Sequence, residues 1–204
     1  MMCSRFTRFP FAILILTLFL SACSSVPLTP QQSTNWDKHQ TQLETITRYQ
    51  VTGKIGYQSP EERHSLNFQW IQKPNSSQLL LTTFLGQTVI KASMTEGHTI
   101  IETGDGQTFE GQDPGRLMYG LTGLSLPIGY LGDWIKGLPT DADDFDLNEL
   151  NTVDHLVKQI GQTNWHLRYN SYIEKGQVLL PSSMKLTQQK TTIKIIASNW
   201  TVSQ

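Results

Sequence analysis

The hydrophobic residues of this chain change their spacing near residue 49, and this change constrains the fold more than any other feature. From Tyr49 to Tyr57 apolar and polar residues alternate one by one, which is typical of a strand with one buried face. Similar short segments follow at regular intervals, separated by turns such as those at residues 73–76 and 104–106. We therefore expect about ten to eleven short strands in a meandering antiparallel sheet.

Two sections have helical spacing instead. Residues 34–48 begin with a capping residue and carry a thin apolar stripe, which predicts a helix that lies on another element. In the section from residue 113 to 138, Pro127 suits the first turn of a helix that Gly137 ends. The expected fold is mainly β: an open antiparallel half-barrel with helices covering an apolar interior.

Two further segments are expected to lie outside regular strands. Pro181 should stop the strand that begins at Gln177, because proline cannot donate to the ladder. The acidic stretch of residues 141–149 lacks the glycine and glutamate spacing of an EF-hand, which favours a solvated loop over a calcium site.

Several apolar residues are expected to be out of phase with the main buried face of their strands. Either helices cover them as a second core, or they line a hydrophobic cavity for a lipid, and the sequence leaves both open. These residues are Leu80, Phe84, Ile90, Ile101, Val157 and Ile196.

The composition excludes several classes of protein. The 204 residues carry 16 basic and 17 acidic side chains, so no basic surface excess indicates a nucleic-acid partner. Two cysteines are too few for a disulfide-dense scaffold and do not have the paired spacing of a zinc site. With 38% hydrophobic and 16% charged residues, the chain is too apolar to be wholly disordered.

The first 22 residues have the pattern of a secretory signal peptide. Arg5 and Arg8 precede about a dozen mostly apolar residues, roughly 18 Å of helix, which is too short for a hydrocarbon core of about 30 Å. The run ends in a segment, residues 20–23, that resembles a bacterial lipobox and places Cys23 at the acylated position. We expect Cys23 to carry an N-acyl diacylglyceryl group and no other cofactor, since three acyl chains anchor a protein stably.

The expected organisation is therefore a signal peptide (1–22), a lipidated N-terminus with a flexible tether (23–33) and one domain (34–204). Ser24, which follows the lipidated cysteine, favours the outer membrane, because an aspartate there is typical of inner-membrane retention. Cys3 would be lost with the signal peptide.

No motif for catalysis or metal binding stands out, so we predict no catalytic residue, no metal and no enzyme. The chain has no GxSxG elbow, no phosphate loop and no HExxH, and solvated surface positions are the favoured interpretation of its histidines. A pair of carboxylates for glycoside hydrolysis stays open, because any two could meet in space, but the sequence nominates none.

One local anomaly remains. Phe84 and Leu85 come directly before Gly86, where a turn is expected and polar residues are usual. Leu85 either tucks into the sheet or protrudes to touch a membrane or an acylated cargo.

Several linked motifs resemble the LolB family of outer-membrane lipoprotein receptors, within the LolA/LolB lipoprotein-localisation group. The resemblance covers essentially the whole mature chain, from Cys23 onward, with the motifs in the right order. These motifs are residues 49–53, 79–86, 121–127, 134–139 and 199–200.

The resemblance implies an open half-barrel whose mouth helices plug, and a receptor that is not an enzyme. It accepts acylated lipoproteins from a soluble periplasmic carrier (LolA-like) in a hydrophobic cavity and inserts them into the outer membrane, without nucleotide. It implies that Leu85, with Phe84 and Gly86, forms a membrane-insertion loop, although family members have proline where this chain has Phe84.

Within that resemblance, we expect the acyl-chain cavity to be lined by the apolar face of the sheet and by the helix near residue 131. The partners would be the carrier, the acylated cargo and outer-membrane lipid at the periplasmic face, with no nucleic acid. The alternative function is a structural or assembly lipoprotein that binds another protein through the same apolar surface. The expected cavity residues are Leu66, Phe68, Trp70, Leu81, Ile128, Leu131, Trp134 and Ile135.

Overall fold

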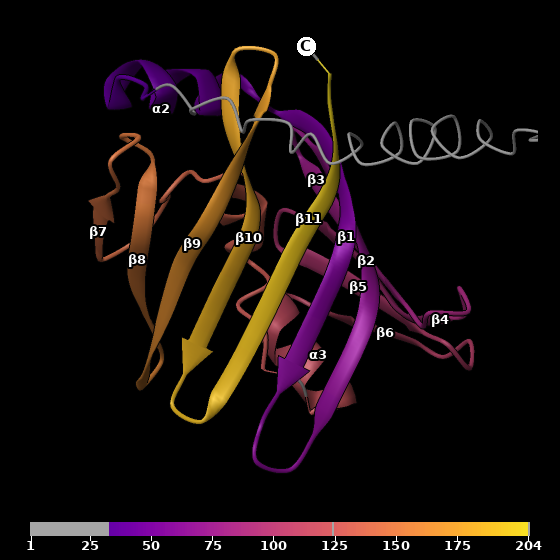
Figure 1. Cartoon of the computed structure of the whole chain (residues 1–204). Coiled ribbons are helices and arrows are strands. Elements are labelled where there is room, and N and C mark those ends of the chain that lie inside the picture. Colours follow the sequence, from indigo (N-terminus) through magenta and orange to yellow (C-terminus); the bar gives the residue numbers. More distant parts are fainter. Residues whose placement is uncertain (1–32, 124, 204) are drawn as a thin grey trace, which may run out of the picture. The chain divides into compact units, whose positions relative to one another are not determined.

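The alternating segments form one antiparallel sheet of eleven strands in the computed structural model, which describes residues 33–123 and 125–203 (Figure 1). The strand order is β6-β5-β4-β3-β2-β1-β11-β10-β9-β8-β7, so within the described residues β6 and β7 are open edges. This confirms the expected open, mainly β architecture. The strands are β1 (Arg48–Gln58), β2 (Arg63–Lys73), β3 (Ser76–Thr82), β4 (Thr88–Thr95), β5 (His98–Thr103), β6 (Thr108–Gly111), β7 (Asp144–Leu147), β8 (Val153–Ile160), β9 (Thr163–Lys175), β10 (Val178–Gln188) and β11 (Thr191–Ser203).

One face of the sheet, which we call the inner face, carries the core. The register aligns buried side chains strand by strand, because period-two alternation places the same parity of each strand on the same face. Each such large apolar side chain stabilises the fold by roughly 1.5–3 kcal/mol. One row across five strands consists of Val51, Trp70, Leu79, Ala92 and Ile101.

Helix α2 (Trp36–Thr45) lies at one end of the sheet and contacts β10 (Figure 1). Asn35 caps it by accepting a hydrogen bond from the Lys38 N–H at 3.0 Å, as the sequence predicts. Leu43, a residue of this helix, is fully buried. His39 is buried as well, so the prediction of surface histidines is wrong at this position.

Between β6 and β7 the chain forms α3 (Pro114–Thr122) and α4 (Leu131–Trp134). The expected helix after Pro127 shrinks to this single turn with turns on either side, because Gly129 and Gly132 lower the helix propensity. The segment ends as predicted at Gly137 (φ +90°), in a Schellman motif whose Leu138 N–H donates to the Asp133 carbonyl at 3.1 Å.

Pro181 does not stop its strand, contrary to the prediction. β10 continues across it through a bulge, at which the pairing with β9 shifts register. The pairing of β10 with β11 begins only at Ser183, so no ladder hydrogen bond to β11 is needed from the proline nitrogen. The Pro181 carbonyl accepts a bond from Trp200 Nε1 at 3.1 Å instead.

Some strand phases also differ from the prediction. Ile90 and Ile101 lie on the inner face and belong to the main core. The prediction failed here because apolar residues stand at both even and odd positions of these strands, so that alternation does not show which face is buried. Leu80, Val157 and Ile196 do lie out of phase with the buried face, as predicted: all three are on the opposite, outer face, where Leu80 and Val157 are half-buried and Ile196 is exposed. The acidic stretch is not wholly a loop either, since it contains the edge strand β7.

Candidate functional site

The β3–β4 loop presents the two most exposed large apolar side chains of the described residues. Phe84 is 86% exposed and Leu85 is 71% exposed. Exposure of two adjacent large apolar side chains to water is unfavourable, and such exposure is typical of surfaces that contact another apolar phase. Of the two arrangements open for Leu85, the structure has the protruding one.

Hydrogen bonds hold this loop in one shape. The Thr83 N–H donates to the Gln87 carbonyl at 2.9 Å, and the Gly86 N–H donates back to the Thr83 carbonyl at 3.0 Å. Gly86 has φ +82°, a conformation that other residues adopt at a cost. Asn67 Nδ2 on β2 also donates to the Thr83 carbonyl, at 3.1 Å. The tip therefore displays its two apolar side chains on a fixed frame.

The expected cavity residues all lie on the inner face or on the segment that covers it. Leu66 is partly buried against the core, and the other seven are buried. Only Trp70 and Ile128 of this set border the open pocket of the inner face. The remaining buried members, packed side chain to side chain, are Phe68, Leu81, Leu131, Trp134 and Ile135.

A pocket of about 490 Å³ opens at the inner face between the sheet and the segment around α4. Trp70, Met94 and Ile128 supply apolar walls, while Thr99 and Asp133 supply polar groups at its border. The pocket lies at the end of the sheet that carries the β2–β3 and β4–β5 turns. It is open to solvent and borders the packed core at Trp70 and Ile128.

Buried polar side chains pin the α4 segment to the sheet. The Tyr49 hydroxyl donates to the Gly132 carbonyl, and the Tyr169 hydroxyl donates to the Trp134 carbonyl at 2.7 Å. Burial raises the pKa of both tyrosines well above the ordinary value, so both stay protonated donors. In the sequence these tyrosines have the spacing of apolar strand residues, and nothing in that spacing reveals the carbonyls that they bind.

Lys136 fastens the end of the same segment. Its Nζ donates to the Ile46 carbonyl at 3.1 Å and pairs with Asp133 at 3.0 Å, although the lysine is almost fully buried. A buried ammonium requires such partners, because an unpaired charge away from water is strongly destabilising. The α4 segment is thus fixed at three points to β1, β9 and the chain after α2.

Helix α3 is held differently. Its one buried residue is Met118, whereas Leu117 and Leu121 are partly buried and Tyr119 is 61% exposed. It contacts β5 and β6, the strands at one open edge of the sheet. A helix that buries so little apolar surface separates from its neighbours at lower free energy than one that buries a full stripe.

The described residues contain no group of three or more His, Cys, Asp or Glu side chains that could hold a metal ion. They also include no helix long and apolar enough to cross a membrane. Burial lowers the pKa of His39, which favours its neutral form. The predicted signal peptide, Cys23 and most of the tether fall within residues 1–32, outside the described residues.

The sequence matches known proteins along its whole β region. A family model described as "Outer membrane lipoprotein LolB" matches residues 47–200, from β1 to β11. The outer-membrane lipoprotein LolB of Vibrio campbellii is 42% identical over 199 residues, covering 95% of this chain and 98% of that protein. The one of Vibrio cholerae is 42% identical over 189 residues, covering 91% and 92%. Among solved structures, a LolA superfamily protein of Nitrosomonas europaea has a TM-score of 0.49 at 9% identity, covering 84% of this chain and 95% of that chain.

Proposed function

The chain belongs to the LolB family of outer-membrane lipoproteins, and from this premise we propose how it carries out lipoprotein localisation at the outer membrane. It accepts the acyl chains of a lipoprotein from a soluble carrier, holds them at the inner face of its sheet, and releases them into the membrane through the β3–β4 loop. The observation that carries this proposal is the fixed, fully displayed pair Phe84 and Leu85.

The loop supports the release step. Transfer of an acyl chain into a bilayer needs a path on which the chain avoids water, because each exposed methylene is unfavourable by about 0.8 kcal/mol. Phe84 and Leu85 insert between lipids and disturb their packing beside the cargo. The hydrogen-bonded frame keeps the tip ordered, so insertion needs no reorganisation of the loop.

The inner face supports the acceptance step. In the described conformation its apolar residues are packed, so acyl chains enter only if a covering element moves. Helix α3 is the element that moves, because it buries little apolar surface against the sheet. The α4 segment keeps its place, because hydrogen bonds from Tyr169 and Lys136 hold it. The pocket beside Trp70 and Ile128 is the first part of the site that the acyl chains occupy.

The direction of transfer follows from affinity. Since the step uses no nucleotide, the carrier must bind the acyl chains less tightly than this protein does, and this protein less tightly than the bilayer does. A closed, packed inner face meets this requirement, because re-forming the core on release stabilises the empty protein.

The variant Leu85→Glu tests the release step. We expect it to fold, to take acylated cargo from the carrier, and to insert that cargo into vesicles at least tenfold more slowly. Val202→Glu, which changes an exposed apolar residue near the end of β11, is the matched control and should insert cargo normally. Normal insertion by Leu85→Glu would exclude the role of the loop.

A crosslink tests the acceptance step. A Cβ at Gly111 on β6 would lie 3.7 Å from the Leu117 side chain of α3, so cysteines in Gly111→Cys and Leu117→Cys can be joined by a short bis-maleimide. We expect the joined protein to refuse cargo and the unjoined double variant to accept it. Mass spectrometry of the wild-type protein should show co-purifying acyl lipid. A dry interior with a bound protein would favour the assembly-lipoprotein alternative.

A further inference from the structure

The outer face carries three cations directly opposite one another on neighbouring strands. Lys185 on β10 is paired in register with Arg168 on β9 and with Lys194 on β11. All three are exposed. We call them the basic row.

Such a row is unfavourable for the sheet itself. Like charges directly opposite on antiparallel strands destabilise the pair, and here Lys185 faces a cation on both sides. Arg168 has an acidic partner, Asp154, at 3.4 Å. Within the described residues, Lys185 and Lys194 form no ion pair. An external anionic surface would remove this unfavourable repulsion.

The basic row lies at the level of the β3–β4 loop. Lys194 is opposite Gly56 on β1, and Gly56 is opposite Ser65 on β2. Two residues further along β2, Asn67 pairs with Thr82, the last residue before the loop. At about 4.8 Å per strand, four spacings place the tip roughly 20 Å from Lys185 along this line.

Between the basic row and the loop, the outer face carries a further exposed basic side chain and an exposed aliphatic one. Lys54 on β1 is exposed and lies opposite Ile196, which is 45% exposed. Exposed aliphatic and basic side chains together suit the headgroup region of a bilayer, where ammonium groups reach phosphates and apolar side chains reach the acyl boundary.

We propose that the basic row binds the phosphates of anionic lipids on the same membrane surface that receives Phe84 and Leu85. This rests on the proposed function, because it assigns a second membrane contact to the same release step. The two contacts together fix the tilt of the sheet over the membrane, which a tip alone cannot do. A phosphate-rich surface is favoured over an acidic protein because the row continues in line to an apolar tip.

The test uses the full-length lipoprotein reconstituted into vesicles, with a fluorophore on Thr187→Cys, two residues from Lys185 on β10. Nitroxide quenchers on the lipid headgroups report how close the outer face comes to the surface. We expect strong quenching in vesicles with one-third phosphatidylglycerol, little in pure phosphatidylcholine, and loss in about 1 M NaCl, where the Debye length is about 3 Å.

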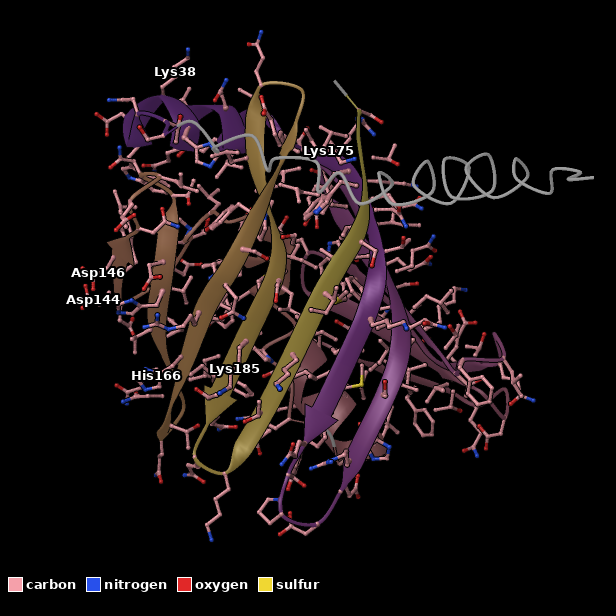
Figure 2. The ribbon with its side chains drawn as sticks, in the orientation of Figure 1. Lys38, Asp144, Asp146, His166, Lys175 and Lys185 are labelled. Atoms are coloured by element: carbon pink, nitrogen blue, oxygen red, sulfur yellow. The ribbon has the colours of Figure 1, made fainter. Side chains whose placement is uncertain are left out.

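The double variant Lys185→Gln/Lys194→Gln should weaken this docking about thirtyfold, since two lysines leave the anionic surface. The matched control is Lys38→Gln/Lys175→Gln, which removes the same charge from exposed lysines near α2, away from Lys185 (Figure 2). The control should dock like the wild type. The row variant should also melt at a higher temperature than the wild type, because the opposed charges are gone.

Equal loss of docking in both double variants would mean that only net charge matters and would overturn the proposal. Unchanged quenching in the row variant would overturn it too. If cargo uptake from the carrier were also slower in that variant, the row would be assigned to contact with an acidic protein. Cargo insertion measured in parallel separates the two proposals. If the row variant no longer docks but inserts cargo normally, the basic row has no part in release, and the proposed role of the loop is unaffected. The role of the loop is tested separately, by cargo insertion in Leu85→Glu.

Discussion

Two neighbouring hairpins of this sheet have loops with the same frame and opposite tips. The β3–β4 loop runs Thr83-Phe84-Leu85-Gly86-Gln87, and the β5–β6 loop runs Thr103-Gly104-Asp105-Gly106-Gln107. In each, the threonine N–H donates to the glutamine carbonyl at 2.9 Å, and the glycine N–H returns to the threonine carbonyl. The two glycines have φ of +82° and +85°. The frame therefore does not depend on which side chains occupy the tip.

The two tips are used in different ways. The Asp105 carboxylate accepts bonds from Thr103 Oγ1 and from Gln107 Nε2, so this loop is satisfied within itself. The backbone of Gly104 packs against β4, and its N–H donates to the Val89 carbonyl at 3.0 Å. Phe84 and Leu85 make no comparable contacts and point into solvent. Because the neighbouring loop forms the same frame with a polar tip, the frame itself does not require the apolar side chains of Phe84 and Leu85.

Exchange of the tips should give the largest effect. Phe84→Gly/Leu85→Asp gives the β3–β4 loop the tip of its neighbour, so the hairpin should fold and the thermal midpoint should stay within a few degrees. Cargo insertion into vesicles should fall about hundredfold, because two side chains that each contribute at least about 1.5 kcal/mol in an apolar phase are lost. Asp105→Asn, at the other tip, is the control. Normal insertion would show that the two tips are equivalent.

The reverse exchange should fail at its first residue. A Cβ on Gly104 would lie 2.3 Å from the Thr88 carbonyl oxygen, so Gly104→Ala must displace backbone. We expect it to lower the free energy of unfolding by about 1–3 kcal/mol, measured by urea denaturation. Phe84→Ala, the equivalent position in the other loop, should leave stability unchanged. Equal stability of both variants would contradict the close packing of Gly104.

The threonines that open the loops allow a smaller test. Thr83 Oγ1 accepts from the Gln87 N–H at 3.2 Å, and Thr103 Oγ1 donates to Asp105. Thr83→Val and Thr103→Val should each reduce the free energy of unfolding by about 0.5–1.5 kcal/mol. Only Thr83→Val should slow cargo insertion, a fewfold, because it loosens the tip that inserts. Equal slowing by both would remove the distinction between the loops.

The smallest effect should be a difference in response to acid. Hydrogen bonds from Thr103 and then Gln107 lower the pKa of Asp105. A carboxyl with a lowered folded-state pKa stabilises its loop above the unfolded pKa, and this contribution is lost as pH falls through the folded value. The β3–β4 loop has no ionisable side chain. Amide proton shifts of Gly106 should therefore follow acidification while those of Gly86 stay constant, and Asp105→Asn should abolish the change.

Much of this molecule is predictable from its sequence. Alternation predicts the strands and most of their buried faces, with Ile90 and Ile101 as exceptions. Asn35 and Asp113 begin their helices as N-caps. Phe84-Leu85-Gly86 stands out because apolar residues are unexpected before a turn glycine, and the structure exposes both apolar side chains. These features are local. Each depends on residues that are near one another along the chain.

The features that escape prediction depend on distant partners. The bulge at Pro181 is tolerated because β11 starts to pair only after it, and the α4 turn is held by Tyr49 and Tyr169 from other strands. The basic row is invisible along the chain, since Arg168, Lys185 and Lys194 meet only through register. The buried position of His39 likewise depends on how α2 lies on the sheet.

The pairing of β1 with β11 has a consequence for how the protein is made. The sheet is a simple meander on each side of this seam, but the seam joins the first and last strands of the described residues. Gly53 makes the join possible, because a Cβ there would lie 1.8 Å from the Ile196 carbonyl oxygen. A chain that is made from its N-terminus keeps this edge of β1 unpaired until β11 has been made. Strand β11 is thus what joins the sheet: a polypeptide without it is left with two separate parts, β1–β6 and β7–β10, that no strand pairing connects.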